Sequence, residues 1–206
     1  MQANQDITFL TDGGEEVRAL TERISPCSEH VIDWFHVTMR ITVLGQFAKG
    51  VAQCDEEAGT RLTKELGRIK WKLWHGNTIA AQEVIEDFED DLSELDVDYP
   101  NLRKFIAAAR EFAVYIASNT ASLINYGERY RSGERISSAF VEATVNAVVS
   151  KRFAKKQQMQ WTRRGAHLLL QTRTRKLDGT LRSTFERWFP GLAIENVGRS
   201  IHAKAA

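Results

Sequence analysis

The first 36 residues predict a βαβ unit, and this unit limits the folds open to the chain. Residues 7–11 are a short apolar run rich in β-formers, and it ends at the turn residues Asp12-Gly13-Gly14. Residues 14–24 have the spacing of an amphipathic helix, and residues 30–34 form a second apolar run. A strand, a helix and a strand in so short a stretch predict a parallel pair with a right-handed crossover.

The rest of the chain has the periodicity of helices. We expect helices over residues 37–51, 56–74, 78–95, 102–126, 139–158 and 162–174, with an acidic loop at 96–100 and a polar break at 127–133. Ser137 or Ser138 is expected to cap the helix that begins at 139. Two strands do not make a stable sheet alone, so we expect further strands to complete it. The sequence predicts an α/β remnant with mostly helical content.

The net charge of +1 hides an uneven distribution along the chain. Residues 1–98 carry 9 Lys and Arg against 20 Asp and Glu, a net of −11, whereas residues 99–206 carry 19 against 7, a net of +12. Ten basic residues and a single acid, Asp178, lie between Ser150 and Arg182. Such a basic region favours a polyanionic partner, with nucleic acid first, although a solvated helix face has the same composition.

Several classes of protein are disfavoured. No apolar run approaches the ~18–20 residues of a membrane span, and the polar start argues against a signal peptide. Cys27 and Cys54 have no paired spacing, so neither a zinc site nor a disulfide framework is expected. We therefore expect a cytoplasmic protein without a membrane partner.

Asp12 is the first candidate for chemistry. It lies at the carboxyl end of the first predicted strand, where open α/β sheets place reacting groups, and the two glycines after it leave room for a phosphate. An Asp-Gly pair after a strand is also ordinary turn chemistry. Asp33 and His36 follow the second strand, and a hydrogen bond between them would fix the imidazole tautomer. The alternative is a polar pair that braces the corner between strand and helix.

Glu142 lies early in the predicted helix 139–158, and Asn146 is one turn further on the same face. An acid there is either a metal ligand or a solvated residue favoured by the helix dipole. Basic residues with amide and aromatic neighbours follow, and they suit phosphate and base contacts. A smaller basic cluster contains two tryptophans that either stack on bases or belong to a helical core. The candidate DNA-binding residues are Lys151, Arg152, Lys155, Lys156, Arg163, Arg164, Lys70, Trp71 and Lys72.

These segments, in this order, resemble the bacterial insertion-sequence DDE transposases of the Mutator-like group. The second acid of that family lies on a strand, as in Leu10-Thr11-Asp12-Gly13, and a Cys-or-Asp, two residues, His signature follows, as in Asp33-Trp34-Phe35-His36. A helical insertion comes next, and the third acid lies on a helix after it. Further similar stretches are residues 70–76, 124–129, 136–146 with Arg152, and 155–161. The resemblance covers nearly the whole chain.

The resemblance implies a partial RNase H-like fold. Residues 1–36 would be the last strands of the core, 37–135 a large all-helical insertion, and 136–206 the catalytic-Glu helix with basic C-terminal helices. It also implies two-metal phosphoryl transfer on transposon ends and target DNA, with Mg²⁺ or Mn²⁺ ions about 3.5–4 Å apart. Asp12 and Glu142 match catalytic metal ligands, and Asp33, His36 and Asn146 match supporting positions. A bacterial, nucleoid-associated protein is implied, and a homo-oligomer is compatible with it.

One part of the family pattern has no match here. The first catalytic Asp of the family lies on a strand upstream of the βαβ unit, and Asp6 precedes Asp12 on the same strand, so it cannot take that place. We therefore expect a truncated C-terminal part that exposes apolar sheet edges, binds duplex DNA weakly and cleaves none alone. The alternatives are a non-catalytic DNA-binding or regulatory protein, and a helical interaction protein whose DNA affinity does not depend on Lys151, Arg152, Lys155 and Lys156.

Overall fold

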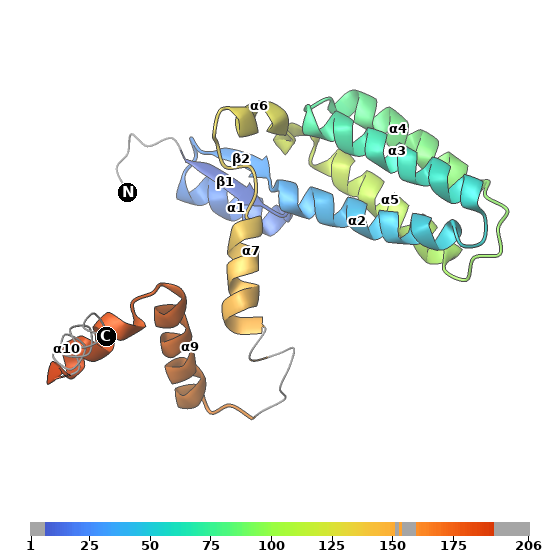
Figure 1. The fold of residues 1–206 in the computed structure, drawn as a ribbon. Helices are drawn as coiled ribbons and strands as arrows, with labels where there is room; N and C mark the ends of the chain where they lie inside the picture. Colours follow the sequence, from blue (N-terminus) through green and yellow to red (C-terminus); the bar gives the residue numbers. More distant parts are fainter. Residues whose placement is uncertain (1–6, 151–152, 154–159, 192–206) are drawn as a thin grey trace, which may run out of the picture. The chain divides into compact units, whose positions relative to one another are not determined.

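A computed structural model describes residues 7–150, 153 and 160–191. The chain forms two compact units, Met1–Ala139 and Phe140–Ala206, and each is described by itself. The first unit contains a small parallel sheet and a helical bundle, and the second contains helices (Figure 1). Among the described residues no helix is both long enough and apolar enough to cross a membrane.

The N-terminal segment forms the predicted βαβ unit. Strands β1 (Thr8–Thr11) and β2 (Glu29–Ile32) are parallel, with Thr8 opposite Glu29 and Thr11 opposite Ile32, and helix α1 (Glu15–Ile24) connects them. In the described parts of the chain the sheet has these two strands. The expectation that the second strand extends to residue 34 is wrong. It ends at Ile32 because Asp33 caps the next helix, accepting a hydrogen bond from the Phe35 amide at 2.8 Å.

Four helices then form an antiparallel bundle joined by short connections (Figure 1). They are α2 (Trp34–Val51), α3 (Glu56–Trp74), α4 (Thr78–Ser93) and α5 (Leu102–Ser118), so α3 has the predicted bounds and α4 ends two residues before the predicted 95. Each helix packs against the next, and α5 packs back against α2. Every helix buries one apolar stripe; that of α3 consists of Ala58, Gly59, Leu62, Leu66, Ile69 and Leu73.

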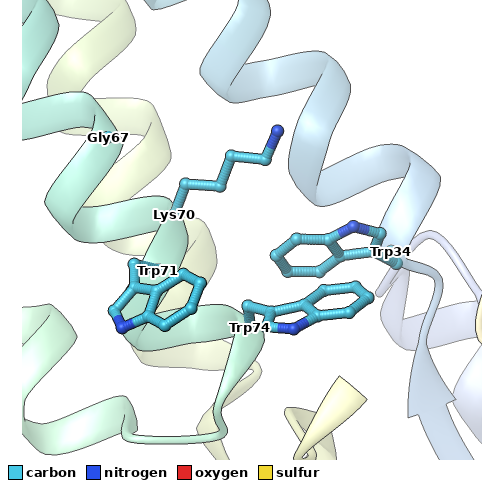
Figure 2. Close-up of a pocket in the computed structure, with 5 residues that line it drawn as sticks. All are labelled: Trp34, Gly67, Lys70, Trp71 and Trp74. Carbon is cyan, nitrogen blue, oxygen red and sulfur yellow. The ribbon is translucent and has the colours of Figure 1, made fainter. Parts of the chain in front are cut away.

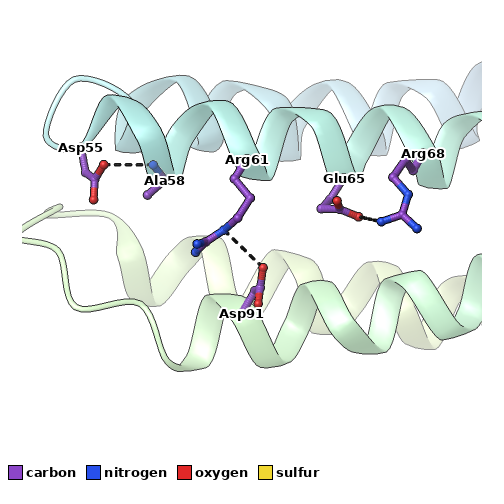
Figure 3. Close-up of polar contacts among 6 residues, drawn as sticks. All are labelled: Asp55, Ala58, Arg61, Glu65, Arg68 and Asp91. Atoms are coloured by element: carbon purple, nitrogen blue, oxygen red, sulfur yellow. Dashed lines mark hydrogen bonds and ion pairs between the residues drawn. The ribbon is translucent and has the colours of Figure 1, made fainter.

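Polar contacts define the outer surface of the bundle. The Asp55 side chain accepts a hydrogen bond from the Ala58 amide at 2.9 Å and so caps α3 (Figure 3). Arg61 forms an ion pair of 3.5 Å with Asp91 on α4. Both of these side chains are about half exposed, so the pair contributes at most about 1 kcal/mol. The bundle therefore depends on its buried stripes rather than on surface charge.

The predicted single helix over 102–126 is wrong, because α5 ends at Ser118 and Asn119 is its C-cap. The Asn119 side-chain amide donates to the Tyr115 carbonyl at 2.8 Å, replacing a backbone donor that would continue the helix. A 3₁₀ turn, η1 (Thr120–Ser122), follows, and α6 (Tyr126–Arg131) occupies most of the predicted polar break. Asn125 caps α6 by accepting from the Glu128 amide at 3.1 Å. Tyr126 is fully buried, and its hydroxyl donates to the Ile32 carbonyl at 2.7 Å, which ties α6 to the sheet.

The second unit has three α-helices in its described residues. Helix α7 (Ala139–Val145) passes into a π-helical turn, η2 (Asn146–Ser150), and α9 (Arg163–Leu177) and α10 (Leu181–Trp188) follow. The predicted helix 139–158 is therefore regular only to residue 145, and its residues 151–152 and 154–158 lie outside the described residues. Helix α9 begins one residue after the predicted 162, with Thr162 as its cap, and it ends at Leu177, three residues after the predicted 174. Helix α10 was not predicted.

One apolar face of the first unit is uncovered. Val17, Leu20 and Ile24 lie on the same side of α1, and they are 40%, 56% and 53% exposed. The adjacent strand β1 is only partly buried, whereas Val31 and Ile32 of β2 are fully buried. The exposed apolar surface of this region therefore lies on α1, whereas the expectation concerned the edges of the sheet.

Candidate functional site at the carboxyl edge of the sheet

Asp12 lies at the carboxyl edge of the parallel strands. Its side chain is exposed, and its Oδ1 atom accepts a hydrogen bond from the Gly14 amide at 3.1 Å. Gly13 has a φ of +91°, a backbone conformation that favours glycine. A Cβ atom at Gly13 would also lie 2.8 Å from Asn119 Oδ1. The close approach of this turn to the end of α5 therefore requires glycine.

Asp33 has a different environment at the end of the neighbouring strand. It is 2% exposed, and its carboxylate accepts hydrogen bonds from the Phe35 amide at 2.8 Å, from the Ser138 amide at 3.1 Å and from the Ser138 hydroxyl. These donors occupy both oxygens. Asp33 therefore anchors the chain before α7 to the start of α2.

The predicted hydrogen bond between the Asp33 and His36 side chains is wrong. The carboxylate oxygens of Asp33 accept from Phe35 and Ser138. His36 bonds to Asp33 through its backbone amide, which donates to the Asp33 carbonyl at 3.0 Å. The half-buried His36 imidazole packs edge-on against the Phe35 ring, with 5.3 Å between centroids. Among the two alternatives for this pair, the structure favours Asp33 as a brace at the strand-to-helix corner.

Arg40 and Tyr115 are site residues that the sequence reasoning missed. The Arg40 guanidinium lies over the Tyr115 ring, 4.2 Å from its centroid. Burial raises the pKa of Tyr115 to about 12 against the opposing charge of Arg40, and the carboxylates of Asp12 and Asp33 add to the increase. The signal for Arg40 was its position one helical turn after His36, which places both on one face of α2.

A groove lies beside this pair. Its lining consists of Arg40, Arg110, Glu111, Val114 and Tyr115, and its volume is about 460 Å³. Two guanidinium groups in one open groove suit a phosphate, because each offers a planar fork of N–H donors. Glu111 reduces the local positive charge without removing it. We call these five residues the arginine groove.

Further contacts hold the sheet edge in place. Arg18 of α1 donates to Asn119 Oδ1 at 2.7 Å, which links the helix after Asp12 to the end of α5. His30 lies within 2.6 Å of the Thr11 hydroxyl through Nε2 and within 2.9 Å of the Ser122 hydroxyl through Nδ1. Burial lowers the pKa of His30, and the nearby Arg18 adds to this effect. The neutral imidazole therefore bridges β1, β2 and η1.

Glu142 and Asn146 are exposed in the second unit. Helix α7 buries none of its residues, and Val141 and Val145 beside Glu142 are 44% and 48% exposed. Asp12 and Glu142 thus belong to different compact units. In the described parts of the chain no three His, Cys, Asp or Glu side chains gather as a metal ion requires.

The predicted basic region has two kinds of residue. Arg163 and Arg164 are exposed at the start of α9, whereas Arg173 donates to the Val148 and Ala147 carbonyls at 3.0 and 2.7 Å and braces the unit. The other four predicted contacts, Lys151, Arg152, Lys155 and Lys156, lie outside the described residues. In the smaller cluster Lys70 and Trp71 are exposed on the last turns of α3, and Lys72 is half-buried. Trp71 is 66% exposed and is therefore not a core residue.

Comparisons with protein-family models, with curated proteins and with solved structures found no match for this chain.

Proposed function

We propose that this chain is part of a DNA-processing protein of the DDE transposase type, and that its βαβ unit is part of an RNase H-like core. The observation that carries the proposal is the exposed carboxylate of Asp12 at the carboxyl edge of two parallel strands. A strand with a terminal acid, a helix, a parallel strand ending in Asp33 and then a helical bundle follow the order expected for that family. In this proposal Asp12 is the second catalytic acid and Glu142 the third.

The first unit contributes a phosphate-binding surface next to Asp12. Arg40 and Arg110 line the arginine groove with Tyr115. The groove approaches the turn after Asp12 through Asn119, because Asn119 donates to the Tyr115 carbonyl and lies against Gly13. In two-metal phosphoryl transfer the ions activate the nucleophile and stabilise the leaving oxygen. Asp12 would supply one ligand, and the chain offers motif matches for two of the three acids. We therefore expect it to bind DNA and not to cleave it alone.

The proposal is tested by DNA binding in the arginine groove. Fluorescence anisotropy of a labelled duplex, titrated at several salt concentrations, would compare the wild-type chain with the Arg40→Gln/Arg110→Gln variant. We expect weaker binding and a salt slope smaller by about 2, one for each lost phosphate contact. The matched control is Arg103→Gln/Lys104→Gln, which removes two charges from the other end of α5, far from the sheet (Figure 1). Equal losses in both variants would contradict the proposal.

A second function is favoured by a separate observation. Arg163 and Arg164 are exposed at the first turn of α9, a helix whose last turn is also basic. This surface suits a non-catalytic DNA-binding or regulatory protein. If Arg163→Gln/Arg164→Gln abolishes duplex binding while the arginine-groove variant binds normally, this second function is the better account.

A further inference from the structure

Three tryptophans enclose a pocket on the first unit. The end of α3 and the start of α2 form a cavity of about 320 Å³, which we call the tryptophan pocket, lined by Trp34, Gly67, Lys70, Trp71 and Trp74. Figure 2 shows Trp71 and Trp74 extending from α3 and Trp34 facing them from α2, with the Lys70 side chain reaching toward α2. The pocket thus has three indole rings and one ammonium group.

Two of the indoles form a fixed wall. Trp34 is 9% exposed, and its ring lies 5.1 Å from that of Trp74 and 4.7 Å from that of Tyr126. Trp74 also packs on Gly127, where a Cβ atom would lie 2.6 Å from the indole nitrogen. These contacts fix the orientation of both rings, so binding here costs little side-chain entropy.

Trp71 forms the open side of the pocket. Its ring contacts the edge of His75, with 4.4 Å between centroids, and the side chain remains 66% exposed. Gly67, one turn earlier, has none of the described atoms within 4 Å of the place where a Cβ atom would lie, so the pocket is open at this position. A large exposed indole next to a preformed aromatic wall is typical of a site that receives a flat ring.

We propose that the tryptophan pocket binds an unpaired nucleobase of a DNA strand, with the neighbouring phosphate at Lys70. Every nucleobase has a π-face that stacks on indole, whereas the bases of a regular duplex are already covered by their neighbours. The ammonium of Lys70 complements the negative phosphate of a nucleotide. An aliphatic side chain of a protein partner would carry no charge for Lys70 to bind. This inference rests on the proposed function, since that supplies DNA as the ligand.

The test compares two DNA probes of the same length. One is a duplex with a single bulged 2-aminopurine, and the other contains the same base fully paired. We expect the wild-type chain to bind the bulged probe more tightly and to quench its fluorescence. Trp71→Ala should weaken binding of the bulged probe about 5- to 150-fold, the range for one lost base stack, and leave the paired probe unchanged. Lys70→Ala should weaken it less, and the loss should shrink at high salt.

Two control variants on the same bundle separate the pocket from general effects. Lys64→Ala removes an exposed positive charge from α3, and Ile79→Ala removes an exposed apolar side chain from α4. Neither residue lines the pocket. Equal affinity of the wild-type chain for the two probes would overturn the proposal. So would a loss on Trp71→Ala that is equal for both probes, or matched by a control.

Further outcomes distinguish this proposal from the proposed function. If Trp71→Ala has no effect while the Arg40→Gln/Arg110→Gln variant loses duplex binding, the tryptophan pocket is wrong and the proposed function stands. If Trp71→Ala loses the bulged probe while the arginine-groove variant binds duplex normally, the pocket stands and the proposed function is wrong. Free dAMP should compete only weakly. Displacement of the bulged probe by dAMP at equal concentration would overturn a DNA strand as the ligand.

Discussion

Removal of the Asp33 carboxylate should destabilise the first unit more than removal of an ordinary helix cap. In the structure this carboxylate caps α2 through the Phe35 amide, and it also holds the Ser138 amide and hydroxyl. Loss of the cap alone costs about 1 kcal/mol. Loss of the two bonds to Ser138 adds about 2 kcal/mol, because bonds to a charged group are stronger and the Ser138 amide loses its acceptor. We therefore expect Asp33→Ala to lower the free energy of unfolding by about 3 kcal/mol.

Asp55 provides a matched control for this measurement. It is also an N-cap aspartate, and its carboxylate accepts from the Ala58 amide at 2.9 Å at the start of α3 (Figure 3). Asp55→Ala should therefore cost only about 1 kcal/mol. Urea unfolding of a Trp161→Phe/Trp188→Phe background leaves the fluorescence of the tryptophans in the unit that contains both caps, Trp34, Trp71 and Trp74.

A double-mutant cycle isolates the contact with Ser138. Ser138→Ala should cost about 1.5–2 kcal/mol alone and much less in the Asp33→Ala background, with a coupling energy of about 1–2 kcal/mol. Equal costs for Asp33→Ala and Asp55→Ala, or a coupling energy near zero, would refute the assignment of Asp33 as the anchor for the segment before α7.

Three other measurements test the fold. The pKa of His30 is lowered in the folded state, so below pH ~6.5 the unfolded state binds more protons and the free energy of unfolding should fall as the pH drops toward the folded pKa. His30→Gln should flatten this pH dependence in urea titrations, and an unchanged dependence would contradict the prediction. A Cβ atom at Gly59 would overlap the end of α2, so Gly59→Ala should lower the free energy of unfolding by about 1–3 kcal/mol. Gly67 has open space at its Cβ position, so Gly67→Ala should be neutral or stabilising by up to about 1 kcal/mol. Thermal unfolding that ranks the two variants in reverse order would refute this packing. Leu20→Lys/Ile24→Lys should reduce concentration-dependent association in sedimentation velocity without loss of helicity, and unchanged association would show that the α1 face is not responsible.

Local patterns were sufficient for the secondary structure where each element is determined by its own residues. The parallel βαβ unit and the bounds of α3 follow from periodicity and turn residues. The break after Ser118 does not, since residues 102–126 have a continuous helical pattern. The helix ends because the Asn119 side-chain amide, rather than a backbone amide, donates to the Tyr115 carbonyl. This competition between side chain and backbone is not visible in the periodicity of the sequence.

The candidate site was only partly predictable, because its geometry depends on contacts between distant residues. Asp33 and Ser138 are 105 positions apart, and nothing local to Asp33 indicates that Ser138, rather than His36, binds its carboxylate. Arg40 and Tyr115 meet through packing of α2 on α5. The exposure of Trp71 could have been predicted from the sequence. The apolar stripe of Leu66, Ile69 and Leu73 already defines the buried face of α3, and Trp71 does not belong to it.

The most direct test of the proposed function is the effect of Asp12→Asn on duplex binding in the absence of divalent metal. Asparagine keeps the oxygen that accepts from the Gly14 amide, so the turn should persist. If Asp12 lies beside bound phosphate, removing its charge relieves repulsion, and affinity should rise about two- to fivefold at low salt. Asp98→Asn is the control, since Asp98 is exposed in the loop between α4 and α5, far from the sheet (Figure 1). An affinity of Asp12→Asn that equals that of the control, or falls below wild type, would contradict the placement of DNA at this edge of the sheet.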